Sequence, residues 1–437
     1  MTRTLTKELH DHIGETVTIQ GWLHKKRLLG GLNFITLRDR SGIAQNLIDT
    51  KDEVEKLRGM QIGTVLALTG VVTADERAPG GAELHDVTVE VMVPVTHESP
   101  IEIDKPLDHK SENLDTLFEN RVVGLRNIRE TNIFKIQAGV KEAARQYFHV
   151  NEFTEFNSPK FLPAATEGGA EVFTLDYFGK EATLAQSAQF YKQIMVGVFE
   201  RAYEINPTYR AEPSATTRHM TEFIHIDAEM GFVDFQGLLN MVGNLLHSVT
   251  SSVWTNYEPE LKSWNAQPIV LTADIPQLTL DEIHELYSKA TGQDSRGEKD
   301  MRPDEEKWIT EYAKKELGSE AVFVTQWPAS EMKFYHRKSA DNPEFAERAD
   351  LIFRGVEIAT ISMREHRYEV LVEQLTAIAG GDPEADGFRY YLQAFKYGLP
   401  AHGGFGMGLE RLTQKIIGLN NVKEASLFPR DINRLTP

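Results

Sequence analysis

The chain has 437 residues, no cysteine and a net charge of −18, with 41% apolar and 26% charged residues. This length corresponds to about two to four domains of ordinary composition. The lack of cysteine excludes disulfides, thiol nucleophiles and cysteine-ligated metals. No apolar run approaches the roughly 20 residues of a membrane span, and the N-terminal residues contain no signal-peptide core. We therefore expect a cytoplasmic protein with no membrane partner.

The negative charge is unevenly distributed along the chain. Residues 1–50 carry seven Lys or Arg against five Asp or Glu, and Lys25-Lys26-Arg27 is their densest point. Contacts with nucleic-acid phosphates need local positive charge, so this segment is the candidate for a nucleic-acid interface. An ordinary solvated charge run explains the same residues equally well.

Residues 16–93 contain short runs in which apolar and polar residues alternate, separated by turns that contain glycine. Strands are predicted at 16–22, 33–38, 43–48, 64–72 and 84–93. Five short strands with such turns are typical of a small barrel or sandwich. The five-stranded OB-fold is one member of that group, and its open face commonly binds single-stranded nucleic acid.

The pattern changes after the predicted barrel. From Asn132, apolar residues recur every three or four positions, which indicates an amphipathic helix. Further helices are predicted at 233–252, 280–291 and 303–317, and strands at 223–232 and on both sides of a turn at 354–355. Antiparallel strands with separate helices favour an α+β fold over a doubly wound parallel sheet. The expected parts of the chain are 1–104, a hinge at 105–130, and 131–437.

The segment PTYRAEPSATTRHMTEFIHIDAEMGF, residues 207–232, combines cations with carboxylates. Arg210, Arg218 and His219 are potential donors in a polar loop, and guanidinium groups match phosphate oxygens two at a time. The strand that follows places Asp227 and Glu229 on one face, two residues apart. This pattern fits a site for ATP with an amino acid or a metal, and a hairpin with a surface salt network explains it as well.

A second pair of carboxylates brackets a predicted tight turn. Asp350 and Glu357 lie on either side of Arg354-Gly355, so a hairpin would bring them near each other. Mg²⁺ favours one or two carboxylates completed by phosphates and water. Arg364, just downstream, is placed to bind a carboxylate substrate. A surface hairpin with exposed acids is the competing interpretation.

Two glycine-rich segments complete the candidates. In AHGGFGMGLERLTQKI, glycines between positions 403 and 408 precede a helix with Glu410 and Arg411, and they permit close approach of a flat ligand or a neighbouring strand. The paired glycines of TEGGAEVF suit a mobile flap. The segment AQSAQFYKQ contains Lys192, a cation for an anionic group. Ordinary strand–helix packing and an ordinary loop are the alternatives.

Together these segments resemble the class II aminoacyl-tRNA synthetases, and among them the compact archaeal-type aspartyl-tRNA synthetases. YRAE…TTRH…DAEM is similar to the second class II motif and GFGMGLERL to the third, behind an OB-like domain. The resemblance covers nearly the whole chain. It implies an α+β catalytic domain with an antiparallel sheet flanked by helices, a homodimer, and ATP-dependent ligation of L-aspartate to tRNA through an aspartyl-adenylate, with Mg²⁺ as the metal.

The resemblance also implies roles for individual residues. The catalytic residues would be Arg210 and Arg411. The ATP site would consist of Arg210, Glu212, Arg218, His219, Glu357, Gly408 and Arg411. Aspartate would be bound by Glu167 on the flap, Gln189, Lys192, Arg210, Asp227, Thr360 and Arg364. The metal ligands would be Asp350, Glu357 and Thr360. Such a site acts by positioning and charge neutralisation rather than by covalent catalysis.

The N-terminal domain resembles an anticodon-binding barrel. Its tRNA surface would consist of His24, Arg27, Phe34, Gln45, Pro79 and Glu83. Phe34 would stack on a base, Gln45 would read the central uridine, and Arg27 would contact the backbone. His24 and Pro79 resemble relaxed members of the family, whereas strict members carry Trp and Lys there. We therefore expect charging of both tRNA(Asp) and tRNA(Asn).

One stretch departs from the family pattern. After Glu357 the chain reads IATISMR, so Ile361 and Ser362 replace the usual glycines. A β-branched side chain at Ile361 is expected to narrow the pocket or to shift the loop. The alternatives are a strictly discriminating aspartyl enzyme, an asparaginyl enzyme, and a synthetase-like paralogue that does not charge tRNA. Lys192 and Arg364 favour a carboxylate over the neutral amide of asparagine.

Overall fold

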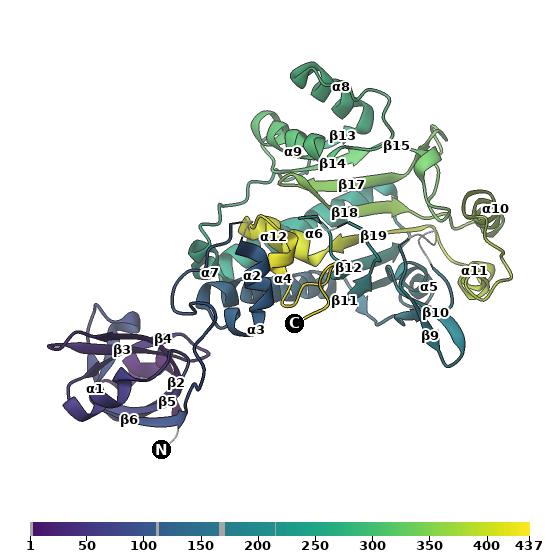
Figure 1. Cartoon of the computed structure of the whole chain (residues 1–437). Helices are drawn as coiled ribbons and strands as arrows, with labels where there is room; N and C mark the ends of the chain where they lie inside the picture. The colour runs from purple at the N-terminus through teal and green to yellow at the C-terminus, as the bar shows by residue number, and fades with distance from the viewer. Residues whose placement is uncertain (1–2, 111–112, 166–170, 215) are drawn as a thin grey trace. The chain divides into compact units, whose positions relative to one another are not determined.

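The computed structural model describes residues 3–110, 113–165, 171–214 and 216–437 (Figure 1). The chain divides into two compact units, one made mainly of residues 1–131 and one of residues 132–436. Among the described helices, none combines the length and the apolar character that crossing a membrane requires.

The first unit contains a closed barrel, which confirms the predicted OB-fold. Its strands are β2 (Thr16–Leu28), β3 (Asn33–Arg38), β4 (Ile43–Ile48), β5 (Val65–Ala74) and β6 (Ala82–Val93). The hydrogen-bonded order β2-β3-β4-β6-β5 closes because β2 also pairs with β5. A two-residue strand, β1 (Arg3–Thr4), pairs with β2. Alternation along the strands sends side chains such as Ile19, Leu37 and Leu68 into the barrel core, where they are fully buried.

Several features of this unit differ from the strand pattern expected from sequence. Strand β2 continues to Leu28 instead of ending at residue 22, and a bulge at His24 separates the pairs Leu23–Leu37 and Lys25–Thr36. The additional helices are η1 (Thr6–His12), α1 (Lys51–Arg58), η2 (Pro79–Gly81), α2 (Leu114–Glu119) and α3 (Arg121–Gly124). The last two of these lie within the segment 105–130.

The second unit is built on an eight-stranded, mostly antiparallel sheet, which confirms the predicted α+β class (Figure 1). Its hydrogen-bonded order is β13-β14-β17-β18-β19-β12-β11-β7. The strands are β7 (Thr154–Glu155), β11 (Arg201–Tyr209), β12 (Glu222–Gly231), β13 (Gln277–Thr279), β14 (Ala321–Thr325), β17 (Arg348–Phe353), β18 (Val356–Met363) and β19 (His402–Gly408). The candidate residues Glu357, Gly408 and Asp227 therefore lie on three neighbouring strands, β18, β19 and β12, in the middle of one sheet.

Helices α4 (Ile128–Val150), α6 (Phe235–Asn256) and α12 (Leu409–Ile417) share one apolar core with the sheet. Alternation along β12 sends Ile226 and Ala228 into this core and turns Asp227 to the opposite face. The turn between β17 and β18 falls at Arg354 and Gly355, as predicted, and both residues have positive φ, 46° and 79°. The polar candidate residues consequently share the face of the sheet that lies away from this core.

Smaller elements flank the sheet. Helices α5 (Gln189–Phe199), α10 (Tyr368–Ala379) and α11 (Arg389–Lys396) share a second core. Helices α8 (Leu280–Thr291) and α9 (Pro303–Tyr312) share a third with β14 and β17. The remaining elements are α7 (Glu258–Ser263), η5 (Ala329–Glu331), η6 (Val422–Ala425), the sheet of β8 (Phe161–Leu162), β9 (Thr174–Tyr177) and β10 (Lys180–Leu184), and the pair β15 (Trp327–Pro328) and β16 (Phe345–Ala346). The helix predicted to reach residue 317 ends at Tyr312, where a π-type turn, Ala313–Leu317, begins.

Candidate active site

A cavity of about 370 Å³ opens on the polar face of the sheet in the second unit. The predicted site residues on its walls are Gln189, Lys192, Arg210, Glu212, Arg218, His219, Asp227, Glu357, Thr360, Arg364, Gly408 and Arg411. Asp350 is 3% exposed and lies behind the wall, paired with Thr360 across β17 and β18. Glu167 lies outside the described residues. Segments more than 200 residues apart in the chain thus converge on one pocket.

Lys192 lines the cavity and is only 1% exposed. Its Nζ lies 2.7 Å from Oδ1 of Asp227, 2.8 Å from the carbonyl oxygen of Phe405 and 3.9 Å from Oε2 of Glu229. Burial of Asp227 opposes its charged form, but Lys192 and His225 hold the pKa of this carboxyl well below its usual value. The Asp227 carboxyl group is therefore in its charged form beside Lys192.

Arg364 lines the same cavity, is also buried, and lies beside the same carboxylate, Glu229, as Lys192. Its Nε and Nη2 donate to the two carboxylate oxygens of Glu229 at 2.8 and 3.2 Å, and its Nη1 donates to Oγ of Ser362. Gly404 makes this arrangement possible, because a Cβ there would lie 2.1 Å from Oε2 of Glu229. The glycine-rich strand β19 thus admits a side chain from the neighbouring strand, which is one of the two uses expected for it.

The cavity is also lined by the three arginines of the predicted ATP site, Arg210, Arg218 and Arg411. Arg210 lies over the ring of Phe223, with 5.6 Å between Cζ and the ring centre, and its guanidinium has no hydrogen-bond or ion-pair partner within the described ranges. Arg411 donates from Nη1 to the carbonyl oxygen of Glu357 at 2.8 Å, and Arg218 donates to Oε2 of Glu306. Such a set of guanidinium groups suits a polyanion such as a triphosphate.

His219 stands beside these arginines. Burial, reinforced by the charge of Arg411, lowers the pKa of His219. Its Nδ1 lies 2.7 Å from Oγ1 of Thr216. The imidazole is therefore neutral near pH 7, and it can contribute a hydrogen bond but no charge to a ligand.

Asp350, Glu357 and Thr360 meet at the edge of the cavity. Oγ1 of Thr360 donates to Oε1 of Glu357 at 2.7 Å, and Arg348 donates to Oδ2 of Asp350 at 2.7 Å. Oδ1 of Asp350 is buried and has no hydrogen-bond partner among the described residues. Burial and the charge of Glu357 raise the pKa of Asp350 to about 7. An unpaired buried oxygen beside a second carboxylate is the environment that a divalent cation would satisfy.

The expectation that Ile361 narrows the pocket is wrong. Ile361 is fully buried in the core between the sheet and its helices and does not line the cavity. The reason is the alternation of β18, which turns Thr360 and Arg364 toward the cavity and Ile361 away from it. Ser362 lies on the cavity side beneath Arg364, where its hydroxyl accepts the bond described above.

Several wall residues were not singled out from sequence, among them Lys333, Tyr335, His336 and Arg348. His336 is 4% exposed, and its Nδ1 has no partner in the part of the chain that the structure describes. The segment KFYHR mixes basic and aromatic residues, which is the signal that was available. Its importance is visible only after a bridge between His336 and Arg364 brings the segment to the cavity.

In the barrel, the structure joins two of the predicted anticodon residues. Nε2 of Gln45 donates to Oε2 of Glu83 at 2.7 Å. Arg27 and Phe34 are cross-strand partners on β2 and β3, whereas His24 is the bulge residue and Pro79 begins η2. Lys26 is occupied elsewhere, because its ammonium donates to the carbonyl oxygens of Leu57, Arg58 and Met60 at the end of α1.

Comparison with known proteins agrees with this geometry. The family model of class II tRNA synthetases (D, K and N) matches residues 113–432, and the model of the OB-fold nucleic acid binding domain matches residues 17–95. The chain therefore belongs to the class II aminoacyl-tRNA synthetases of this group and is an enzyme. ATP and tRNA are the substrates that membership implies.

Individual relatives resemble the chain over its whole length. The aspartate–tRNA(Asp/Asn) ligase of Thermus thermophilus is 40% identical over 439 residues, with 100% of both chains covered. The aspartate–tRNA(Asp) ligase of Pyrococcus abyssi is 38% identical, with 99% of this chain and 98% of that one covered. The crystal structure of asparaginyl-tRNA synthetase from Pyrococcus horikoshii with asparaginyl-adenylate has a TM-score of 0.92 at 28% identity, with both chains fully covered.

Proposed function

We propose that this synthetase activates L-aspartate with ATP and attaches it to both tRNA(Asp) and tRNA(Asn). The observation that carries the amino-acid assignment is that Lys192 and Arg364 line the same cavity and both lie beside the carboxylate of Glu229. Both side chains are hydrogen-bond donors only. A carboxylate accepts from both of them, whereas the NH₂ group of asparagine would meet another donor.

In the proposed reaction, the aspartate α-carboxylate attacks the α-phosphorus of ATP and pyrophosphate leaves. Arg210 neutralises the charge that builds up between these two anions, because its guanidinium is otherwise unpaired within the described residues. Arg218, His219 and Arg411 hold the outer phosphates. The protein forms no covalent intermediate, so its contribution is orientation and charge compensation. Transfer of the activated aspartate to tRNA follows in the same cavity.

The residues fit a magnesium ion at the edge of this site. Asp350 and Glu357 would hold it, with the Thr360 hydroxyl beside them, and the ion would add positive charge against the phosphates. In the ranges that the structure describes, no group of three or more His, Asp or Glu side chains gathers to hold an ion. This agrees with an ion whose remaining ligands are phosphates and water, as Mg²⁺ prefers.

The barrel is proposed to bind the anticodon through Phe34, Gln45 and Arg27. Charging of both tRNAs is supported by His24 and Pro79, which resemble relaxed members of the family. Relatives from Thermus thermophilus and Deinococcus radiodurans, 40% and 38% identical, are named as ligases for tRNA(Asp/Asn).

The protein is proposed to act as a cytoplasmic homodimer. This assembly is the one that the resemblance to the class II aminoacyl-tRNA synthetases implies. Sedimentation velocity tests this, because a species with the mass of one chain at micromolar concentration would contradict it.

Two measurements test the proposed activity. ATP–pyrophosphate exchange is compared with aspartate and with asparagine, and labelled aspartate is then offered to transcripts of tRNA(Asp) and tRNA(Asn). We expect exchange with aspartate alone and similar charging of both tRNAs. Exchange with asparagine alone would identify an asparaginyl enzyme, the class of the similar Pyrococcus horikoshii structure. A preference above about a hundredfold for tRNA(Asp) would remove the dual specificity.

A further inference from the structure

A single carboxylate from α9 contacts two segments of the cavity wall. Glu306 is 8% exposed. Its Oε2 accepts a hydrogen bond from Nη2 of Arg218 and another, at 3.0 Å, from the backbone N–H of Glu357. Arg218 lies in the loop between β11 and β12, and Glu357 lies on β18. Glu306 therefore connects an irregular loop to the central sheet.

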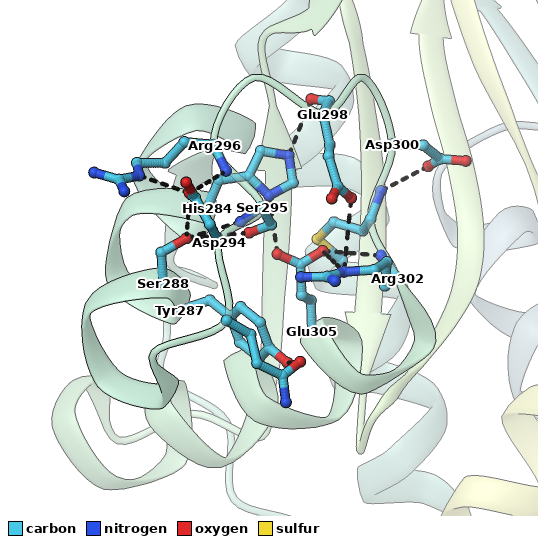
Figure 2. Close-up of polar contacts among 12 residues, drawn as sticks. His284, Tyr287, Ser288, Asp294, Ser295, Arg296, Glu298, Asp300, Arg302 and Glu305 are labelled. Carbon is cyan, nitrogen blue, oxygen red and sulfur yellow. Dashed lines mark hydrogen bonds and ion pairs between the residues drawn. The ribbon is translucent and has the colours of Figure 1, made fainter.

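Helix α9 is held firmly enough to act as a fixed support. Figure 2 shows the polar contacts between α8, the loop that follows it, and the start of α9. Nδ1 of His284 lies 2.9 Å from Oε1 of Glu305, and the backbone N–H of Arg302 donates to Oε2 of Glu305 at 3.0 Å. His284 and Glu305 are both fully buried. The residue directly before Glu306 is thus anchored on α8.

A second contact fixes α9 to the strand hairpin. The backbone N–H of Gly355, in the turn between β17 and β18, donates to Oγ1 of Thr310 at 3.0 Å. Thr310 lies one helical turn after Glu306, so the two side chains dock on neighbouring backbone groups of the same hairpin. Glu306 therefore has little freedom to follow Arg218, and Arg218 must adapt to Glu306.

The contact leaves Arg218 able to bind a ligand. Only its Nη2 is engaged by Glu306, and its buried Nε has no partner among the described residues. A guanidinium binds a phosphate through two adjacent N–H groups, so the remaining edge still offers the geometry that this needs. Without Glu306, the Arg218 side chain and its loop would sample many conformations. The conformational entropy lost when ATP orders them would then weaken ATP binding.

We propose that Glu306 is a positioning residue for ATP, which orients Arg218 toward the outer phosphates from the fixed helix α9. This inference rests on the proposed placement of ATP in the cavity. It does not depend on which amino acid is activated. Glu306 touches no substrate in this role and acts through Arg218.

The test uses the full chain with Glu306→Ala and Glu306→Gln, and with Glu311→Gln as an exposed control on the same helix. Binding of Mg-ATP is measured calorimetrically without amino acid, and KM and kcat are measured by ATP–pyrophosphate exchange. We expect Glu306→Ala to weaken ATP binding about tenfold and to raise KM for ATP by a similar factor, with KM for aspartate unchanged. Glu306→Gln, which keeps an acceptor oxygen, is expected to restore most of the ATP affinity, and Glu311→Gln to match the parent.

A double-variant cycle separates positioning from a general structural role. In the background of Arg218→Ala, Glu306→Ala is expected to have no further effect on ATP affinity, because the residue through which it acts is gone. Equal effects of Glu306→Ala with and without Arg218 would overturn the inference, as would unchanged ATP binding by a folded Glu306→Ala variant. Because binding is measured without amino acid, these results are distinct from a failure of aspartate activation, which would instead contradict the proposed function.

Discussion

Arg364 and Glu229 form a two-bond ion pair, with both side chains almost completely removed from solvent. Burial opposes the charged form of Arg364, but the carboxylate of Glu229 raises its pKa. Glu229 engages the Nε–Nη2 edge and Ser362 accepts from Nη1. The direction of the guanidinium is therefore set by the protein before any substrate arrives.

Replacement of Arg364 by lysine tests whether a guanidinium group, with its several N–H donors, is needed at this position. Lysine keeps the charge but presents a single ammonium, which cannot satisfy Glu229 and a substrate carboxylate with the same geometry. We expect KM for aspartate in ATP–pyrophosphate exchange to rise about tenfold or more, with KM for ATP nearly unchanged. Arg367→Lys is the control, because Arg367 pairs with Glu365 and its side chain is 59% exposed. An unaltered KM for aspartate would show that the guanidinium of Arg364 is not used to recognise aspartate.

Ser362→Gly tests the residue that replaces the expected glycine. Removal of the hydroxyl leaves Nη1 of Arg364 without its acceptor, and a hydrogen bond to a charged group contributes about 1.5–3 kcal/mol. We expect about half of this energy to be lost from aspartate binding, so KM for aspartate should rise about threefold to tenfold, while KM for ATP stays constant.

Ile361→Val is the matched control for Ser362→Gly, since Ile361 points into the core. It should lower the free energy of unfolding by about 1 kcal/mol without a change in KM. The reverse result, with KM altered by the Ile361 variant alone, would contradict the placement of these two side chains on opposite faces of β18.

Stability should depend on pH through Glu410 of α12. Burial raises the pKa of Glu410 to about 7, although the backbone N–H of Ile224 donates to its two oxygens at 3.0 and 3.2 Å. Because the pKa is higher in the folded than in the unfolded chain, the native state binds more protons between about pH 4.5 and pH 7. The stabilisation is complete below this window and is lost as the pH rises through it.

The corresponding variant is Glu410→Gln, which resembles the protonated side chain. We expect the parent to lose about 2 kcal/mol more unfolding free energy than Glu410→Gln between pH 5 and pH 8, as measured by urea denaturation. Glu311→Gln, at an exposed position, should follow the parent. Parallel pH profiles for the parent and Glu410→Gln would disprove the raised pKa.

Phe34→Ala tests the barrel as a tRNA-binding surface. Phe34 is half-buried on β3 opposite Arg27. Loss of one stacked base weakens binding by about 1–3 kcal/mol, so KM for tRNA in aminoacylation should rise at least about fivefold. ATP–pyrophosphate exchange without tRNA should be unaffected. Phe178→Ala removes an aromatic side chain that is 92% exposed in the second unit and serves as the control.

Local pattern was sufficient for much of the fold. Strands β3 and β4 and helix α8 have the predicted bounds, and the hairpin turn falls at Arg354 and Gly355. These elements follow from alternation, helical period and turn residues, which are properties of neighbouring positions. The same alternation, applied to β18, would have placed Ile361 in the core. A glycine-rich pattern at these positions does not by itself show which face of the strand each position occupies, whereas the alternation of β18 does.

The identity of the chemical groups in the site was also available from the sequence, since Lys192, Arg210, Glu357 and Arg364 were all named from motifs and all line one cavity. Which group each of them contacts was decided by the tertiary structure. Glu306 holds Arg218, Ser362 holds Arg364, and His336 reaches the pocket wall only because strands distant in sequence pair in one register. Residue type and spacing determine what a side chain is able to bind, whereas its actual partner depends on long-range packing, in which a shift of one residue along a strand turns every side chain to the other face.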